Sequence, residues 1–192
     1  MLDVMPLGET VMTSENLANP GPLGLLGFGM ATIVLSMFKL GVYEMNAVIL
    51  AVALFLGGIA QVFAGLMEYK RNRMFTATVF TFFGMFWILF AVMNKGLLGT
   101  VNPDALVVFY FLLFLLAIVL FIGSRAGGSK VVSITFAFLV VLLALLTVGT
   151  FTGEEIIIQI AGAVGIITGG GAFYIACAEM LNEQYKKPVL PL

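Results

Sequence analysis

Six long apolar stretches, separated by short polar connectors, constrain the fold of this chain more than any other feature. Each holds about 20 mostly apolar residues, the length of an α-helix that crosses the roughly 30 Å hydrocarbon core of a bilayer. They fall at 22–40, 47–67, 74–93, 105–122, 131–150 and 156–181. We therefore predict an all-α integral membrane fold with six transmembrane helices per protomer.

The charge content favours the same class. Only 10% of the 192 residues are charged and 61% are hydrophobic, whereas soluble domains carry about 25% charged residues. Residues 1–18 contain Asp3, Glu9 and Glu15 but no apolar core, so we interpret them as a polar N-terminal tail and not as a signal peptide. The expected organisation is this tail, a six-helix transmembrane domain over 19–185 and a C-terminal tail over 186–192.

The residue content argues against several functional classes. Histidine is absent and Cys177 is the one cysteine, which removes His-based metal, haem and nucleophilic sites and any internal disulfide. A net charge of −1 gives no basic excess for nucleic-acid binding. The charges are scattered, while a membrane enzyme would need clustered catalytic residues. We expect no enzymatic activity, no cofactor, no metal and no nucleic-acid partner.

The basic residues are divided unevenly between the two sides of the membrane. Seven of the nine lysines and arginines lie on the side of the N-terminal tail, namely Lys70, Arg71, Arg73, Arg125, Lys130, Lys186 and Lys187. The other side has Lys39 and Lys95. Short cytoplasmic loops carry such an excess of basic residues. We therefore predict that both termini are cytoplasmic and that the chain is a multi-pass protein of the plasma membrane.

The segment NPGPLGLLGFG (19–29) puts two prolines and four glycines where the first span begins. Proline costs little in the first turn of a helix, because an N–H group there has no intrahelical partner. Asn19 is a candidate N-cap, so the segment predicts a sharply defined helix start. Since a helix N-terminus carries partial positive charge, this start is also a candidate position for an anion.

Three segments resemble one known family. NPGPLGL, which comprises Asn19, Pro20, Gly21, Pro22, Leu23, Gly24 and Leu25, closely resembles the NPAPLGL signature of the acetate uptake transporter family, also called GPR1/FUN34/YaaH. GGIAQVFAGLMEYKRNRMFTATVFTFFGMFW (57–87) and GAFYIACAEMLNEQYKKPVLPL (171–192) resemble further family segments in the same order. The resemblance implies a six-helix protomer, assembled as a homohexamer, that transports acetate, with succinate and other small monocarboxylates as further candidates.

In this family the pathway narrows at a Phe, a Tyr and a Leu from the first, third and fifth helices. The resemblance puts this constriction at Phe28, Phe83 and Leu139, and Phe83 lacks the hydroxyl of the family's Tyr. The three residues lie 6, 9 and 8 positions after residues 22, 74 and 131, which is about 9 to 14 Å of helix rise. Residues at one depth can form a ring.

Polar residues inside a span are costly to bury and therefore indicate either function or pairing. The resemblance implies that Gln61 lies near the substrate, where its amide can donate hydrogen bonds to a carboxylate. An interhelical hydrogen bond is the structural alternative for this residue. Further candidates for substrate binding are Asn19, Thr32 and Asn46.

Three acidic residues near the tail side allow two interpretations. They are candidates for proton transfer or, as we favour, for structural pairing with the basic residues of the same side. These residues are Glu68, Glu179 and Glu183.

The sequence also limits the mechanism. No lysine or arginine lies in the middle of an expected span, so a buried salt bridge is disfavoured as the binding site, and a narrow uncharged route suits a small monocarboxylate. We expect a channel-like pathway for acetate through each protomer in the lipid bilayer. The open alternatives are a proton-coupled acetate or succinate symporter, ammonium export, and a helical partner or sensor that transports nothing.

Overall fold

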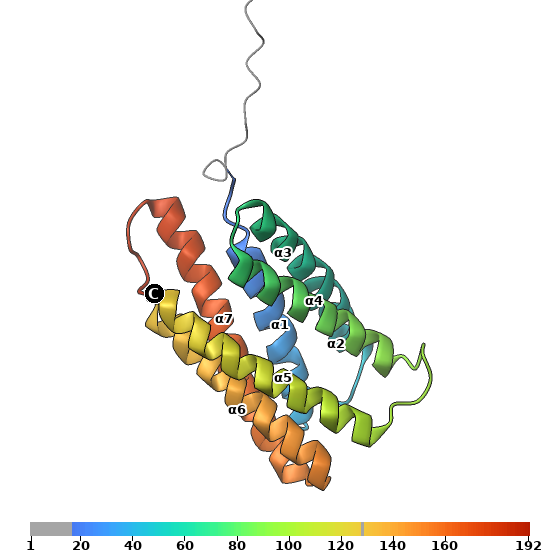
Figure 1. Cartoon of the computed structure of the whole chain (residues 1–192). Helices are drawn as coiled ribbons and strands as arrows, with labels where there is room; N and C mark the ends of the chain where they lie inside the picture. The colour runs from blue at the N-terminus through green and yellow to red at the C-terminus, as the bar shows by residue number, and fades with distance from the viewer. Residues whose placement is uncertain (1–16, 128) are drawn as a thin grey trace, which may run out of the picture.

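The computed structural model describes residues 17–127 and 129–192, and its regular elements are all helices (Figure 1). Six helical spans are long and apolar enough to cross a membrane, which confirms the predicted all-α, six-span architecture. Residues 1–16 of the predicted N-terminal tail lie outside the described residues. The elements are α1 (Gly21–Lys39), α2 (Ala47–Ala51), the π-helical segment η2 (Val52–Ala60), α3 (Gln61–Lys70), α4 (Met74–Asn94), α5 (Pro103–Ser124), the 3₁₀ turn η3 (Arg125–Gly127), α6 (Lys130–Thr152) and α7 (Glu155–Tyr185).

The second span differs from the single α-helix expected over 47–67. It consists of α2, η2 and α3, and its nine central residues wind as a π-helix. Neighbouring helices approach this segment very closely. A Cβ at Gly27 of α1 would collide with the carbonyl oxygen of Leu56, and a Cβ at Gly57 would lie 2.7 Å from Cγ of Trp87. The wider winding therefore occurs where η2 packs closely against both α1 and α4, and no proline in the span signals it.

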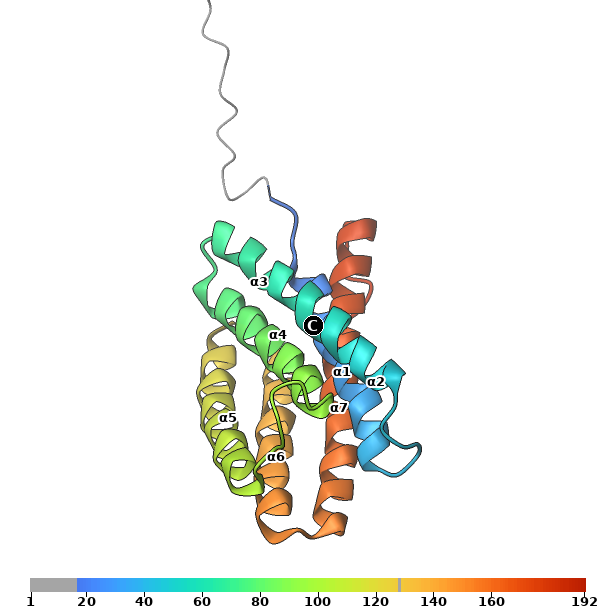
Figure 2. The same ribbon diagram turned by 90° about the vertical axis from the view of Figure 1, so that its right-hand side faces the viewer.

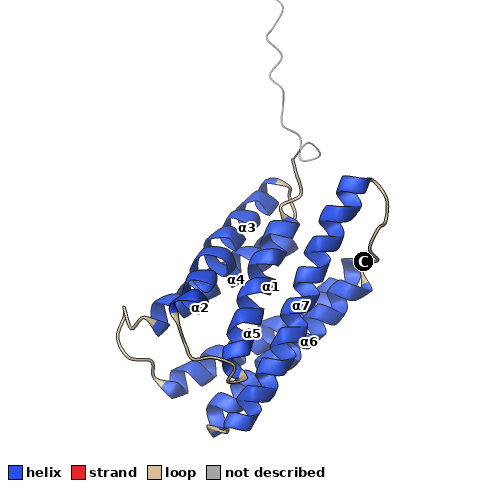
Figure 3. Ribbon diagram, turned by 180° about the vertical axis from the view of Figure 1, so that it is seen from behind, coloured by secondary structure: helices blue, strands red, loops and turns tan. Residues whose placement is uncertain are grey.

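α1 lies at the centre of the bundle, between α7 on one side and η2 with α3 on the other (Figures 1 and 3). α3 packs on α4, and α6 packs on both α5 and α7 (Figure 2). Successive spans alternate in direction, so that α1, α4 and α6 all begin at one end of the bundle. We call this end the Asn19 face and the other end the opposite face.

Small residues bring α1 and α7 together. The GxxxG pair Gly165 and Gly169 of α7 faces α1 of the same chain: a Cβ at Gly169 would lie 2.8 Å from the carbonyl oxygen of Gly29, and one at Gly165 would collide with Oγ of Ser36. Such close approach is a common packing mode of membrane helices. The glycines therefore fix the position of α7 against the helix that carries the NPGPLGL segment.

The C-terminal residues fold back along α7. Lys186 has a left-handed backbone conformation with φ of 53°, which reverses the chain direction. The Asn182 side chain then accepts hydrogen bonds from the N–H groups of residues 189 and 190 at 2.6 and 2.9 Å and donates to the carbonyl of Leu190 at 2.8 Å. The Tyr174 hydroxyl donates to the carbonyl of Pro191 at 2.9 Å. The last residues are thus attached to the end of α7.

Candidate functional site

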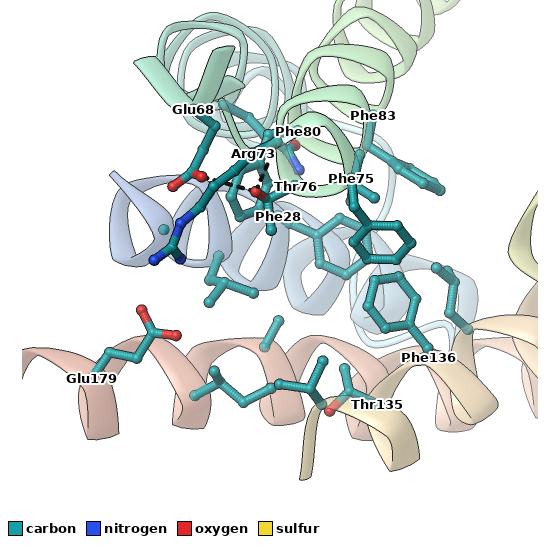
Figure 4. Close-up of a pocket in the computed structure, with 18 of the residues that line it drawn as sticks. Phe28, Glu68, Arg73, Phe75, Thr76, Phe80, Phe83, Thr135, Phe136 and Glu179 are labelled. Carbon is teal, nitrogen blue, oxygen red and sulfur yellow. Dashed lines mark hydrogen bonds between the residues drawn. The ribbon is translucent and has the colours of Figure 1, made fainter. Parts of the chain in front are cut away.

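A cavity of about 160 Å³ opens at the Asn19 face and extends into the bundle between α1, α3, α4, α6 and α7 (Figure 4). Its wall is mostly apolar, with polar side chains at its open end and again near its inner end. An apolar cavity of about 150 Å³ in another protein holds benzene. The space is therefore sufficient for a small organic acid.

Three apolar side chains, which we call the neck, form the inner end of the cavity. They are Phe28 of α1, Phe83 of α4 and Leu139 of α6. The two aromatic rings meet edge to face with centroids 5.7 Å apart, an arrangement that aromatic pairs prefer. Phe83 and Leu139 are 3% and 5% exposed and belong to one buried cluster, against which Phe28 packs. The structure thus brings together the three residues predicted to form the constriction.

Beyond the neck, toward the opposite face, the bundle is filled with apolar side chains. Leu142, Leu143 and Leu146 of α6 pack with Leu113 of α5 in the cluster that includes Phe83. Among the described residues, this apolar cluster lies between the cavity and the opposite face. Passage through the protein requires side chains of the neck and of this cluster to move.

Charged side chains surround the open end of the cavity, which we call the mouth (Figure 4). Glu68 of α3 is 1% exposed. Its Oε1 lies 3.2 Å from Nη1 of Arg71, and its Oε2 accepts a hydrogen bond of 2.8 Å from Oγ1 of Thr76. Arg73 and Glu179 complete the charged part of the lining. Glu68 is thus paired with Arg71 of the loop between α3 and α4, as the structural interpretation of this residue predicts.

Asn19 joins three parts of the mouth. Its Oδ1 accepts hydrogen bonds from the Gly21 N–H at 3.1 Å and from Arg71 Nη1 at 2.8 Å, while its Nδ2 donates to Oε2 of Glu179 at 2.9 Å. The N-cap prediction needs a correction of one residue, because Pro20 occupies the cap position and Gly21 begins α1. The Asn19 side chain still satisfies the first helical N–H, and it does so while connecting α1 to α7.

Gln61 lies at the start of α3 and lines the cavity near the neck. It is 1% exposed, and its Oε1 has no hydrogen-bond partner among the described residues. A buried amide oxygen without a partner costs about 1–3 kcal/mol. The Gln61 amide is thus a buried polar group in the wall of a mostly apolar cavity.

Besides Thr76 at the mouth, two more hydroxyl residues of the lining were not among the predicted site residues. Thr168 of α7 is fully buried, and Thr135 of α6 lies near Gly171. Both line the cavity. They are polar residues within apolar spans, which is the same signal that identified Gln61.

The remaining predicted residues lie outside the cavity lining. Thr32 is buried, and its Oγ1 donates to the backbone carbonyl of Phe28 at 2.7 Å. Asn46 lies at the opposite face, where its side chain caps α2 by accepting from Val48 N at 2.9 Å. Glu183 is exposed near the end of α7. Within 17–127 and 129–192, no three His, Cys, Asp or Glu residues gather into a possible metal site.

Comparison with known proteins identifies the family. Residues 4–191 match the GPR1/FUN34/yaaH family. The chain belongs to this family. It is 43% identical over 185 residues to the succinate-acetate/proton symporter SatP of Escherichia coli K12, a match that covers 94% of this chain and 98% of SatP. Membership confirms the resemblance and makes the protein a multi-pass membrane transporter or channel, not an enzyme.

Two further GPR1/FUN34/YaaH comparisons bear on the site. A solved structure described as that of the bacterial acetate channel SatP matches with a TM-score of 0.87 at 42% identity and covers 92% of this chain and 99% of that one. The ammonia transport outward protein 2 of Saccharomyces cerevisiae is 33% identical over 180 residues, which is 87% of this chain and 63% of the yeast protein. The family architecture is thus associated with carboxylates and with ammonia.

Proposed function

We propose that this protein transports acetate and related small carboxylic acids across the plasma membrane, through the cavity and neck of each protomer. The observation that carries the proposal is a cavity with a polar mouth and an apolar inner end, in a chain 43% identical to SatP. Phe28, Phe83 and Leu139 act as a constriction that limits size and leak. Gln61 and the Asn19 helix start help to position the substrate.

The polarity of the route supports a small substrate. Bare transfer of an ionised carboxylate into a medium of low dielectric constant costs about 20 kcal/mol in the Born limit. Arg73 is the one cation among the residues that line the cavity, and it lies at the mouth. The inner part must therefore work with amide and hydroxyl groups, which suits a single carboxyl group better than a large or multiply charged molecule.

We infer the orientation and the assembly from the sequence. The Asn19 face carries seven of the nine basic residues, and such an excess marks the cytoplasmic side. Both termini are therefore cytoplasmic, and the cavity faces the cytoplasm. Many large apolar side chains are exposed on the single chain, among them Phe55, Phe63 and Val119. They contact lipid or neighbouring protomers in a homohexamer, the assembly implied by the family resemblance.

Uptake of radiolabelled acetate into proteoliposomes tests the transport function. The protein is expected to raise the initial rate well above that of protein-free liposomes made from the same lipid. Unlabelled acetate and succinate are expected to compete, whereas an equal concentration of chloride is not. A rate equal to that of protein-free liposomes contradicts the proposal, and protein-dependent uptake of labelled methylammonium without acetate uptake favours ammonium export.

Currents in a planar bilayer distinguish a channel from a coupled carrier. The channel-like pathway that we propose gives an acetate-dependent current whose reversal potential follows the acetate gradient. A proton-coupled symporter responds to a pH gradient imposed at equal acetate concentrations. The carboxylates Glu68 and Glu179 at the mouth are the protein groups available for such coupling.

A further inference from the structure

A second hollow, of about 470 Å³, lies between the end of α5 and the start of α6. The two helices pack side by side, and the connection between them is at the Asn19 face (Figure 1). None of the described residues that line this hollow also lines the cavity of the candidate functional site. We call it the α5–α6 hollow, and it is a feature separate from the proposed transport pathway.

Two cations at the α5–α6 hollow have no acidic partner among the described residues. Arg125 of η3 and Lys130 in the first turn of α6 line the hollow, and both are exposed. In the part of the chain that the structure describes, the one ion pair joins Arg71 to Glu68. None of the described residues that line the hollow is acidic. The charge of its lining is therefore purely positive.

Ser129 adds a hydrogen-bond donor to the same lining. It is the N-cap of α6, and its Oγ accepts a hydrogen bond of 3.2 Å from the N–H of Val132. This bond uses a lone pair of the oxygen and leaves the hydroxyl proton for another acceptor. A guanidinium, an ammonium and a hydroxyl proton thus line one hollow, and such donors form strong charge-assisted hydrogen bonds to the oxygens of a phosphate group.

Apolar side chains continue the hollow along the two helices, away from the cations. On α5, Phe121 lies one turn before Arg125. On α6, Ile134 and Ala137 lie one and two turns after Lys130, and Ile134 is 56% exposed. At a rise of 1.5 Å per residue, this apolar part extends about 6 to 11 Å from the charged part toward the bilayer centre. A phosphate group followed by an acyl chain has the same order of polarity.

A hollow of about 560 Å³ at the opposite face has a different charge. Lys39 lines it together with Glu44 and Glu155, so two carboxylates counteract one ammonium group and disfavour an anion. The α5–α6 hollow lies instead at the face that we infer to be cytoplasmic. Basic pockets between membrane helices on that side bind the headgroups of anionic lipids.

We propose that the α5–α6 hollow binds an anionic phospholipid. The lipid phosphate lies between Arg125 and Lys130 and accepts a hydrogen bond from the hydroxyl of Ser129. An acyl chain lies along Phe121 and Ile134. This site is independent of the transported substrate, so its failure in a test would leave the proposed transport function untouched.

Native mass spectrometry of the purified full-length protein in detergent measures the Kd for phosphatidylglycerol. The charge variant, Arg125→Gln with Lys130→Gln, is expected to raise this Kd about tenfold or more, because both cations that attract the phosphate are lost. Lys70→Gln with Lys187→Gln is the matched control. It removes the same charge from the same face, at exposed residues that do not line the hollow, and it should change the Kd little. Equal Kd values for the two double variants overturn the proposal.

Two further ligands distinguish a lipid from its parts. Phosphatidylcholine, which has no net charge, is expected to bind about tenfold more weakly than phosphatidylglycerol. Glycerol phosphate, which has the anion but no acyl chain, should not displace phosphatidylglycerol at an equal concentration. Equal binding of phosphatidylcholine or full displacement by glycerol phosphate overturns the proposal. A changed mass of the assembly in the charge variant, with an unchanged Kd, also overturns it and favours a second copy of the chain as the occupant.

Thermal unfolding gives an independent measurement, because a ligand that binds the folded state raises the unfolding midpoint. Phosphatidylglycerol is expected to raise the midpoint of the wild-type protein and of the control variant, but not that of the charge variant. A rise of equal size in all three proteins contradicts the proposal. If the charge variant does not fold, Lys130→Gln alone takes its place, with Lys187→Gln as its control.

Discussion

The ring of Phe28 meets the ring of Phe83 edge to face, with 5.7 Å between centroids and 82° between planes. The two residues come from spans that run in the same direction, and their contact closes the inner end of a cavity that is polar at its mouth. Phenylalanine side chains carry no hydrogen-bonding group. A size limit set by this contact therefore depends on the volume of the two side chains.

Widening the neck is therefore expected to relax size selectivity. Phe83→Ala and Leu139→Ala should each raise the ratio of butyrate to acetate uptake about tenfold or more, since one methylene in a limiting apolar pocket is worth about 1–3 kcal/mol. Uptake of the two labelled acids into proteoliposomes measures this ratio. Phe111→Ala is the control, because Phe111 is 46% exposed on α5 and does not line the cavity.

Core truncation of a phenylalanine also costs about 3–5 kcal/mol of stability. Each variant must therefore elute as the wild-type protein does in size-exclusion chromatography before its uptake is compared. An unchanged butyrate to acetate ratio in both folded neck variants contradicts the constriction at these residues.

The second prediction concerns the hydrogen bond from Asn19 to Glu179. Asn19→Asp cannot donate to Glu179 and puts two carboxylates together, so the variant is expected to lose about 1–3 kcal/mol of stability. Glu179→Gln added to Asn19→Asp restores one donor and one acceptor between the positions and should recover most of the loss. Thermal unfolding in detergent, followed by the fluorescence of the buried Trp87, measures both effects.

Glu183→Gln is the matched control for this pair, because Glu183 is exposed one turn after Glu179. It should change the unfolding midpoint little, both alone and with Asn19→Asp. If the double variant Asn19→Asp with Glu179→Gln is no more stable than Asn19→Asp with Glu183→Gln, the hydrogen bond between Asn19 and Glu179 does not stabilise the folded protein.

The sequence predicts the spans well because hydropathy reports the cost of placing each residue in lipid, and that cost is a property of the segment itself. All six spans appear at the predicted places. The polar Gln61, buried within an apolar span, could be identified as a candidate site residue for the same reason. The hydropathy of the span does not reveal that Gln61 lies beside the neck. The family resemblance implied a place near the substrate, and the packing of α1 against α3 produces it.

Features that arise from contacts between helices could not be predicted in this way. The π-helical winding before Gln61 accompanies close backbone packing between Leu56 and Gly27, and neither residue signals it alone. The return of the C-terminal tail begins at Lys186, a left-handed position without a glycine to mark it. Thr168 was missed because threonine is common in apolar helices, and only the cavity distinguishes it from Thr32, whose hydroxyl bonds to a neck carbonyl.

The close approach of α1 to the second span gives a third prediction. Gly27→Ala places a methyl group against the carbonyl of Leu56, and overpacking of this kind costs about 1–3 kcal/mol or more. Gly170→Ala on α7 is the control, because its Cβ would meet no atom within 4 Å and alanine gains about 0.5–1 kcal/mol in a helix interior. The unfolding midpoint should fall for the first variant and stay or rise for the second. Equal midpoints would show that the backbone contact does not constrain the bundle.

The attachment of the C-terminal tail gives the last prediction. Asn182 makes three hydrogen bonds to residues 189 and 190, and their loss in Asn182→Ala should let the tail leave α7. Amide hydrogen exchange at residues 189 and 190 is then expected to speed up about tenfold or more, because exchange reports local opening. Gln184→Ala is the control, since Gln184 is exposed two residues away and makes none of these bonds. Exchange that is equally slow in both variants means that Tyr174, through its bond to the Pro191 carbonyl, is sufficient to hold the tail.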